Sequence, residues 1–186
     1  MFYVIMKNAI ILHGTGCNPK SYWIPYIKKF LEDKGYDVWV PQLPDLENPD
    51  LKKQLPFILK NAKFNKDTII IGHSAGGPLA ISILEHINVK IHKAIIVAGY
   101  ARIKGSKKPE KILQKNYDWN KIKNNVQDII FINSDNDPWG CNDIEGRYMF
   151  DNLGGTLIIR HGEGHMGSDS FKQPYKEFPL LKRLLP

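Results

Sequence analysis

The chain has 186 residues, of which 42% are hydrophobic and 24% are charged, and these values favour one globular domain over residues 1–186. Its net charge of +7 comes largely from lysines scattered along predicted helices. Because no nucleic-acid-binding motif accompanies this charge, we expect no nucleic-acid partner. No run of about 18 apolar residues is present, so no membrane-spanning helix is expected.

Two features of the sequence report on cellular location: the N-terminal residues and the cysteines. The first 14 residues lack a basic segment and a small-residue cleavage site, so we expect no signal peptide. Cys17 and Cys141 cannot build a disulfide framework and form no CxxC pair. We therefore expect reduced thiols and a cytoplasmic protein.

Short apolar runs alternate along the chain with stretches of helical periodicity. Trp23, Ile27 and Leu31 share one helical face, and Gly35 suits the cap that ends this helix. The predicted helices are residues 21–35, 50–61, 75–86, 143–152 and 175–185. The predicted strands are residues 8–14, 36–44, 67–74, 91–100, 128–135 and 156–162.

The predicted strands are continuous apolar runs, which indicates that both faces of the sheet are buried. Alternation of strands with helices favours a parallel sheet with right-handed crossovers and helices on both sides. The sequence therefore predicts an α/β fold, a three-layer sandwich with about six parallel strands.

One segment, residues 99–127, interrupts this alternation because it is long, basic and poorly periodic. It is either a solvated excursion or a small cap over a pocket, since long insertions in compact α/β domains often cover active sites. If it is a cap, Tyr100 and Trp119 are expected to face the substrate.

The sequence "GHSAG", Gly72 to Gly76, matches the G-x-S-x-G pattern of a nucleophilic serine. It follows an apolar strand and precedes a predicted helix, which is the context that the pattern requires. Flanking side chains would collide with neighbouring elements in such a turn, so glycines are needed at both ends. We expect Ser74 to be exposed above the sheet, near the N–H groups that begin a helix.

A serine hydroxyl needs a base, and a histidine base needs a carboxylate to orient it. Functional loops of parallel α/β folds lie at the carboxyl ends of the strands. The loop after the predicted fifth strand offers Asp135 and Asp137, and we favour Asp137 because Pro138 fixes its conformation. The loop after the sixth offers His161 and His165, and we favour His165 because flanking glycines let it reach back over Ser74.

A metal site is the alternative for the last of these loops. His161, Glu163 and His165 could bind an ion, but their spacing and the glycines between them fit no helical zinc motif. We therefore expect no metal ligands and no cofactor.

Stabilisation of an oxyanion needs two N–H donors close to the serine. We expect one from Ala75 and the other from the "HGTG" loop, where Thr15 is favoured over Gly16. The residues predicted to line the substrate pocket are His13, Gly14, Gly16, Tyr100, Trp119 and Trp139.

Five segments, "HGTG", "YDVWVPQLPD", "GHSAGG", "SDNDPW" and "GEGHM", together give a resemblance over nearly the whole chain. The chain resembles the YdeN-like small serine hydrolases of the α/β-hydrolase superfamily, a group that includes the retinoblastoma-binding-protein hydrolase. The resemblance implies a compact Rossmann-like sheet with strand order 2-1-3-4-5-6. It also implies Ser74 as nucleophile, Asp137 as orienting acid and His165 as base.

The sequence thus predicts a serine hydrolase that cleaves small acyl esters or thioesters through an acyl-serine intermediate. The alternatives are an acyltransferase, which needs only an acceptor that outcompetes water, and a non-catalytic module on the same scaffold. In the latter case the basic segment 99–127 would contact a protein partner.

Overall fold

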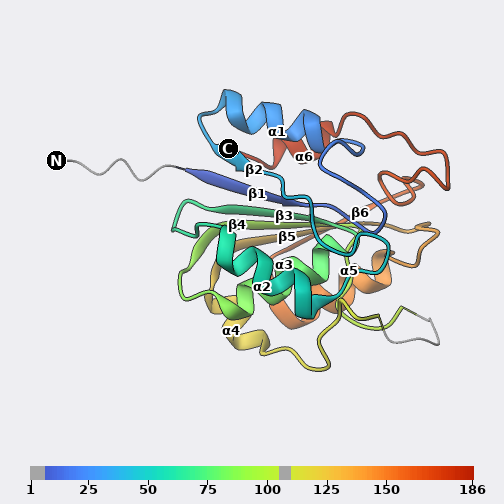
Figure 1. The fold of residues 1–186 in the computed structure, drawn as a ribbon. Coiled ribbons are helices and arrows are strands. Elements are labelled where there is room, and N and C mark those ends of the chain that lie inside the picture. The colour runs from blue at the N-terminus through green and yellow to red at the C-terminus, as the bar shows by residue number, and fades with distance from the viewer. Residues whose placement is uncertain (1–6, 105–109) are drawn as a thin grey trace.

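The computed structural model describes residues 7–104 and 110–186 (Figure 1). Six strands form one parallel sheet in the order β2-β1-β3-β4-β5-β6, which confirms the predicted α/β fold and strand order. The strands are β1 (Asn8–Leu12), β2 (Asp37–Trp39), β3 (Ile69–His73), β4 (Ile91–Val97), β5 (Val126–Ser134) and β6 (Thr156–Arg160).

In the described residues six helices flank the sheet. Figure 1 shows α1 and α6 on one face and α2, α3, α4 and α5 on the opposite face. They are α1 (Ile24–Asp33), α2 (Leu51–Asn61), α3 (Gly76–His86), α4 (Trp119–Asn124), α5 (Asp143–Leu153) and α6 (Pro179–Arg183). All residues of β3 are buried, as expected for a central strand covered on both faces. Among the described residues, none of these helices combines the length and apolar character needed to cross a bilayer.

The two predicted elements that shorten most in the structure do so at prolines. The expected helix over residues 175–185 is confined to α6, because Pro179 drives Phe178 out of the helical region to φ −139° and ψ 77°. The expected strand over residues 36–44 ends at Trp39, because Pro41 and Pro44 cannot donate to a sheet ladder.

The register of the sheet brings the loops after several strands to one edge. Leu12 of β1 lies beside Gly72 of β3, and His73 lies beside Val97 of β4. Val97 in turn lies beside Ile132 of β5. The loops that follow these strands therefore meet at the carboxyl ends, on the right of the sheet in Figure 1.

Candidate active site

Ser74 lies in the sharp turn between β3 and α3, with a backbone φ of 53° that side-chain-bearing residues seldom adopt. Its N–H donates to the Val97 carbonyl at 3.0 Å, and its carbonyl accepts from Gly77 N–H at 2.8 Å. These bonds hold the turn in its strained conformation, with the side chain of Ser74 half-buried.

The glycines around Ser74 are required by close contacts between backbones. A Cβ at Gly72 would collide with the Gly76 carbonyl, and one at Gly76 would collide with the Leu12 carbonyl. A Cβ at Gly14 would lie 2.8 Å from the Cβ of Ser74, so the loop after β1 packs directly on the serine. The glycines at positions 72 and 76 are therefore needed to avoid steric collisions, as the sequence predicts.

Two histidine–aspartate pairs follow β5 and β6, and they differ in burial. His165 Nδ1 lies 2.7 Å from Asp137 Oδ2, and both side chains are almost inaccessible to solvent. His161 Nδ1 lies 2.6 Å from Asp135 Oδ2, but the side chain of His161 is 97% exposed. The two candidates set aside in the sequence thus pair with each other on the surface.

The hydrogen bonds of the buried pair show which ring nitrogen of His165 carries the hydrogen. Asp137 Oδ1 accepts from Trp139 N–H at 2.8 Å, while Oδ2 faces the imidazole. Because a carboxylate oxygen accepts, the hydrogen of the neutral ring lies on Nδ1. The Nε2 atom of His165 therefore keeps its lone pair.

A cavity of about 510 Å³ joins Ser74 to His165 at the carboxyl ends of the strands. In the described residues Ser74 makes no hydrogen bond to His165, a contact that is often long before substrate binds. Residues that the sequence analysis did not assign to the cavity also line it: Cys17, Tyr22, Glu47, His73, Lys104, Glu110, Cys141, Gly167, Ser168, Asp169 and Ser170.

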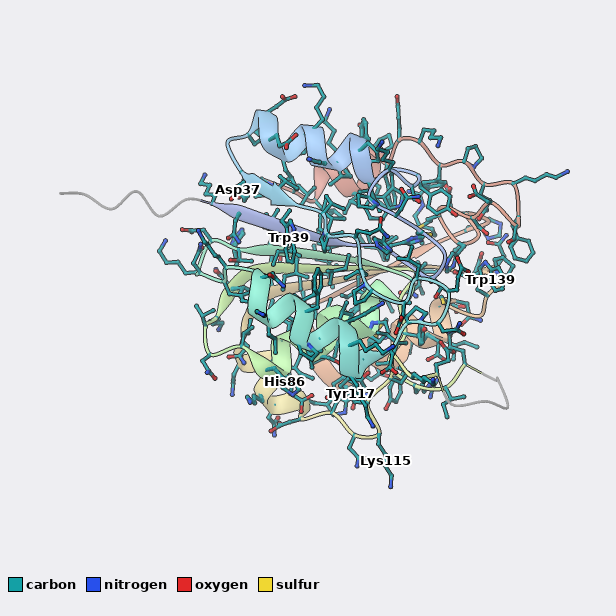
Figure 2. All side chains as sticks on the ribbon, viewed as in Figure 1. Asp37, Trp39, His86, Lys115, Tyr117 and Trp139 are labelled. Atoms are coloured by element: carbon teal, nitrogen blue, oxygen red, sulfur yellow. The ribbon has the colours of Figure 1, made fainter. Side chains whose placement is uncertain are left out.

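Five of the residues predicted at the site lie at the wall of this cavity. Gly14, Thr15, Gly16, Tyr100 and Trp139 line the cavity. Trp139 is half exposed, and Figure 2 shows it at the right-hand end of the molecule. Its ring packs edge-on against Phe171 at a centroid distance of 5.3 Å.

Trp119 and His13 do not line this cavity. Trp119 begins α4 and stacks on Tyr117, at 4.9 Å between ring centroids, and Tyr117 lies on the lower side of Figure 2. His13 is buried because it links two loops: Nδ1 donates to the Gly14 carbonyl and Nε2 accepts from Leu43 N–H. The sequence pattern revealed neither the stacking of Trp119 nor the hydrogen bonds of His13.

Part of the predicted cap contributes to the cavity wall. Glu110 accepts a hydrogen bond from the Tyr100 hydroxyl and lies 2.8 Å from Lys104 Nζ. Lys104 Nζ also lies over the Tyr100 ring, 3.1 Å from its centroid. Residues 105–109 of the segment lie outside the described residues, and its role as a cap stays a prediction.

The N–H groups near Ser74 are not equally free. Gly16 N–H donates to the Leu46 carbonyl at 2.9 Å. Within residues 7–104 and 110–186, the N–H groups of Thr15 and Ala75 donate to no other residue. The N–H group of Thr15 is therefore available to a ligand, whereas that of Gly16 is already engaged.

The metal alternative from the sequence has no support in the geometry. His161 faces Asp135, and Glu163 contacts Arg160 and accepts from the Tyr175 hydroxyl at 2.9 Å. His165 faces Asp137 instead. The three residues are therefore engaged in separate contacts.

His73, which the sequence did not single out, ties the serine turn to the histidine loop. Its Nε2–H donates to the His165 carbonyl at 3.0 Å, and its ring centroid lies 5.0 Å from that of His165. Complete burial, with a smaller effect of His165, lowers the pKa of His73 to about 3. Trp23 assists by donating from Nε1 to the Met166 carbonyl at 3.0 Å. His73 is therefore neutral and acts as a structural donor.

Replacing this donor gives a prediction for stability. His73→Phe should lower the free energy of unfolding by about 1–3 kcal/mol near neutral pH, because the His165 carbonyl loses its buried partner. Since the pKa of folded His73 lies at about 3, below its ordinary value of 6.5, the unfolded chain binds more protons between these values. Stability from neutral His73 is present above pH 6.5 and is lost as pH falls toward 3. Urea unfolding across this range should show weaker pH dependence in the variant.

His86 offers a matched control because it is an exposed histidine, labelled in Figure 2, whose Nδ1 donates to the Ser82 carbonyl of its own helix. His86→Phe removes no fully buried contact and should leave the free energy of unfolding near the wild-type value at neutral pH. Wild-type pH dependence in the His73 variant would show that His73 does not titrate as described.

Comparisons with known proteins agree with this architecture. A family model described as serine hydrolase matches residues 9–185. The chain is 27% identical to the serine hydrolase RBBP9 of Rattus norvegicus over 174 residues, 89% of this chain and 90% of that one. It is 27% identical to YdeN of Bacillus subtilis (strain 168) over 99 residues, 52% of each chain.

Solved structures share the fold. The crystal structure of YdeN from B. subtilis superposes with a TM-score of 0.84 at 21% identity, covering 96% of both chains. Est1E from Butyrivibrio proteoclasticus gives 0.68 at 16% identity, covering 98% of this chain and 91% of that one. The match of the family model over almost the whole chain, carried on an α/β-hydrolase sheet, shows that the chain belongs to the serine hydrolase family and is similar to YdeN and RBBP9.

Proposed function

We propose that Ser74, His165 and Asp137 form the catalytic triad of a hydrolase that cleaves small acyl esters. The observation that carries the proposal is the buried hydrogen bond between His165 and Asp137, on the wall of the cavity that holds the strained Ser74. A volume of about 510 Å³ lies in the range of small-molecule sites.

The first half of the reaction forms an acyl-serine. As Ser74 Oγ attacks the ester carbonyl carbon, His165 Nε2 takes the hydroxyl proton. Asp137 holds Nδ1–H and stabilises the imidazolium that results. The free N–H groups of Thr15 and Ala75 are suited to bind the oxyanion, and each such donor contributes about 2.7–4 kcal/mol.

The second half releases the acid. It begins from the acyl-serine, which is complete once the imidazolium has given its proton to the leaving alkoxide and the carbonyl has re-formed. Water then gives a proton to His165 Nε2 and attacks the acyl carbon. As that intermediate collapses, the imidazolium returns the proton to Ser74 Oγ and the acid leaves.

A fluorophosphonate probe tests the nucleophile directly, because it reacts covalently with an activated serine. The folded wild type should be labelled and Ser74→Ala should not. Ser170→Ala is the matched control, since Ser170 lines the same cavity and should not be required for labelling. Labelling of Ser74→Ala, or no labelling of a folded wild type, would contradict the proposal and favour the binding module. Turnover of p-nitrophenyl acetate, with and without added alcohols, separates hydrolysis from acyl transfer.

A further inference from the structure

Three side chains with metal-binding atoms meet at the wall of the cavity. The ligand atoms of Asp137, Cys141 and His165 all lie within 4.8 Å of one another, and these residues form the one such group in the described part of the chain. We propose that they bind a divalent thiophilic ion, Zn²⁺ or Cd²⁺, and that the bound ion switches the hydrolase off. The switching part of this proposal rests on the proposed function, and the binding part does not.

The loop after β5 folds so that residues 137 and 141 approach each other. Gly140, with φ 76°, adopts a conformation that favours glycine, and its N–H donates to the Asp137 carbonyl at 3.2 Å. The Cys141 carbonyl accepts from the buried side chain of Asn133 at 2.9 Å. The backbone is therefore fixed on both sides of the thiol, and the group does not depend on a free loop.

The donor set selects the class of ion. A thiolate, an imidazole and a carboxylate suit Zn²⁺ and Cd²⁺, whereas Mg²⁺ and Ca²⁺ prefer oxygen ligands alone. Bond lengths to Zn²⁺ of about 2.0–2.3 Å place tetrahedral ligand atoms about 3.3–3.8 Å apart. Atoms already within 4.8 Å of one another need only small side-chain rotations to reach this geometry.

The site is buried but can be reached from the cavity. The exposed fractions of Asp137, Cys141 and His165 are 8%, 1% and 5%. The Cys141 sulfur makes no hydrogen bond to any described residue, so at the sulfur an ion would displace only the thiol proton, which passes to solvent. Cys141 and His165 line the cavity, which supplies an entry path and a fourth ligand position for water.

An ion bound here would block His165, the proposed base, whichever of its two ring nitrogens it contacts. An ion on Nδ1 displaces the ring proton to solvent and breaks the hydrogen bond to Asp137. An ion on Nε2 takes the lone pair that would remove the proton of Ser74. In either arrangement His165 cannot serve as the base, so occupancy and hydrolysis exclude each other.

The chain contains a matched control thiol. Cys17 also lines the cavity, but its sulfur donates to the Thr15 carbonyl at 3.3 Å and it does not belong to the three-residue group. A reaction of metal with any buried thiol of the cavity would involve both cysteines. The proposed site requires Cys141 alone.

Titration with Cd²⁺ tests binding through the ultraviolet charge-transfer absorption of a cadmium thiolate. Wild type, Ser74→Ala and Cys17→Ala should each develop the band with one ion per chain, and Cys141→Ala should not. Zn²⁺ and Cd²⁺ should inhibit p-nitrophenyl acetate hydrolysis by the wild type, reversibly on addition of EDTA. For each variant, inhibition is scored against its own metal-free rate. Cys141→Ala should need an ion concentration about 10- to 100-fold higher, or more.

The two proposals fail in different ways. The metal site is overturned if Cys141→Ala keeps the band or the wild-type sensitivity, if Cys17→Ala loses either, or if the folded wild type shows no band. The band in Ser74→Ala does not require hydrolysis, so it appears even if the protein has no esterase activity. If the wild type binds Cd²⁺ through Cys141 and still hydrolyses ester at full rate, the inhibitory role is wrong.

Discussion

His165→Ala should lower kcat for p-nitrophenyl acetate by roughly 10⁶-fold, the loss seen when a triad histidine is removed from a serine hydrolase. Without the imidazole no base takes the proton of Ser74, and Asp137 keeps a buried carboxylate with no ring to orient. The measurement is a steady-state rate, with circular dichroism and thermal unfolding to establish that the variant is folded.

The second histidine–aspartate pair provides the control for this experiment. His161→Ala removes a ring that is 97% exposed and should leave kcat unchanged. Added imidazole should partly restore activity to His165→Ala, because a free base can enter the cavity, and a purely structural defect would not respond. Equal losses in the two variants would remove His165 from its proposed role.

The sequence predicted a parallel α/β sheet because its strands are continuous apolar runs, and the resemblance to a family added the strand order. Runs such as Ile69–Ile71 are apolar without alternation, and a strand of this kind has few places to lie except inside a parallel sheet. Helix ends were harder, because α6 depends on a proline whose effect on Phe178 competes with an otherwise helical pattern.

The choice between the two aspartates and between the two histidines could be argued from the sequence only through glycines and a proline. What separates the pairs physically is burial, and burial depends on the loops that pack over them. Gln173, for example, accepts from His165 N–H at 2.9 Å and donates to the Glu163 carbonyl. No local pattern places Gln173 against this loop.

The cavity wall was the least predictable part of the site. Trp119 is an aromatic residue in a suspected cap, but it packs on Tyr117 and Tyr148 away from the cavity. Glu47 reaches the cavity from the loop after β2, where its carboxylate lies over Gly16, and nothing in its neighbours indicates this. Cys141 lies four residues after Asp137, and that spacing becomes meaningful only once the turn between them is known.

Asp137→Asn should lower kcat by roughly 10⁴-fold while leaving the fold intact. The amide is nearly the same size as the carboxylate, but its NH₂ group can donate to His165 Nδ1. The ring then carries its hydrogen on Nε2, and no lone pair faces the serine. Steady-state kinetics with p-nitrophenyl acetate measures the loss, and fluorophosphonate labelling should slow in parallel, because both reactions need the same activated hydroxyl.

Asp135→Asn is the matched control, because Asp135 makes the same kind of contact to a histidine. Its carboxylate accepts from Gly162 N–H and from the imidazole of His161. Both hydrogen bonds lower the pKa of Asp135, and the one from Gly162 has the larger effect. If a histidine–aspartate contact after these strands were enough for activity, the two variants would be equally impaired. The structure predicts a large loss only at position 137, because only that pair faces the cavity of Ser74, and a larger loss at position 135 would reverse the assignment.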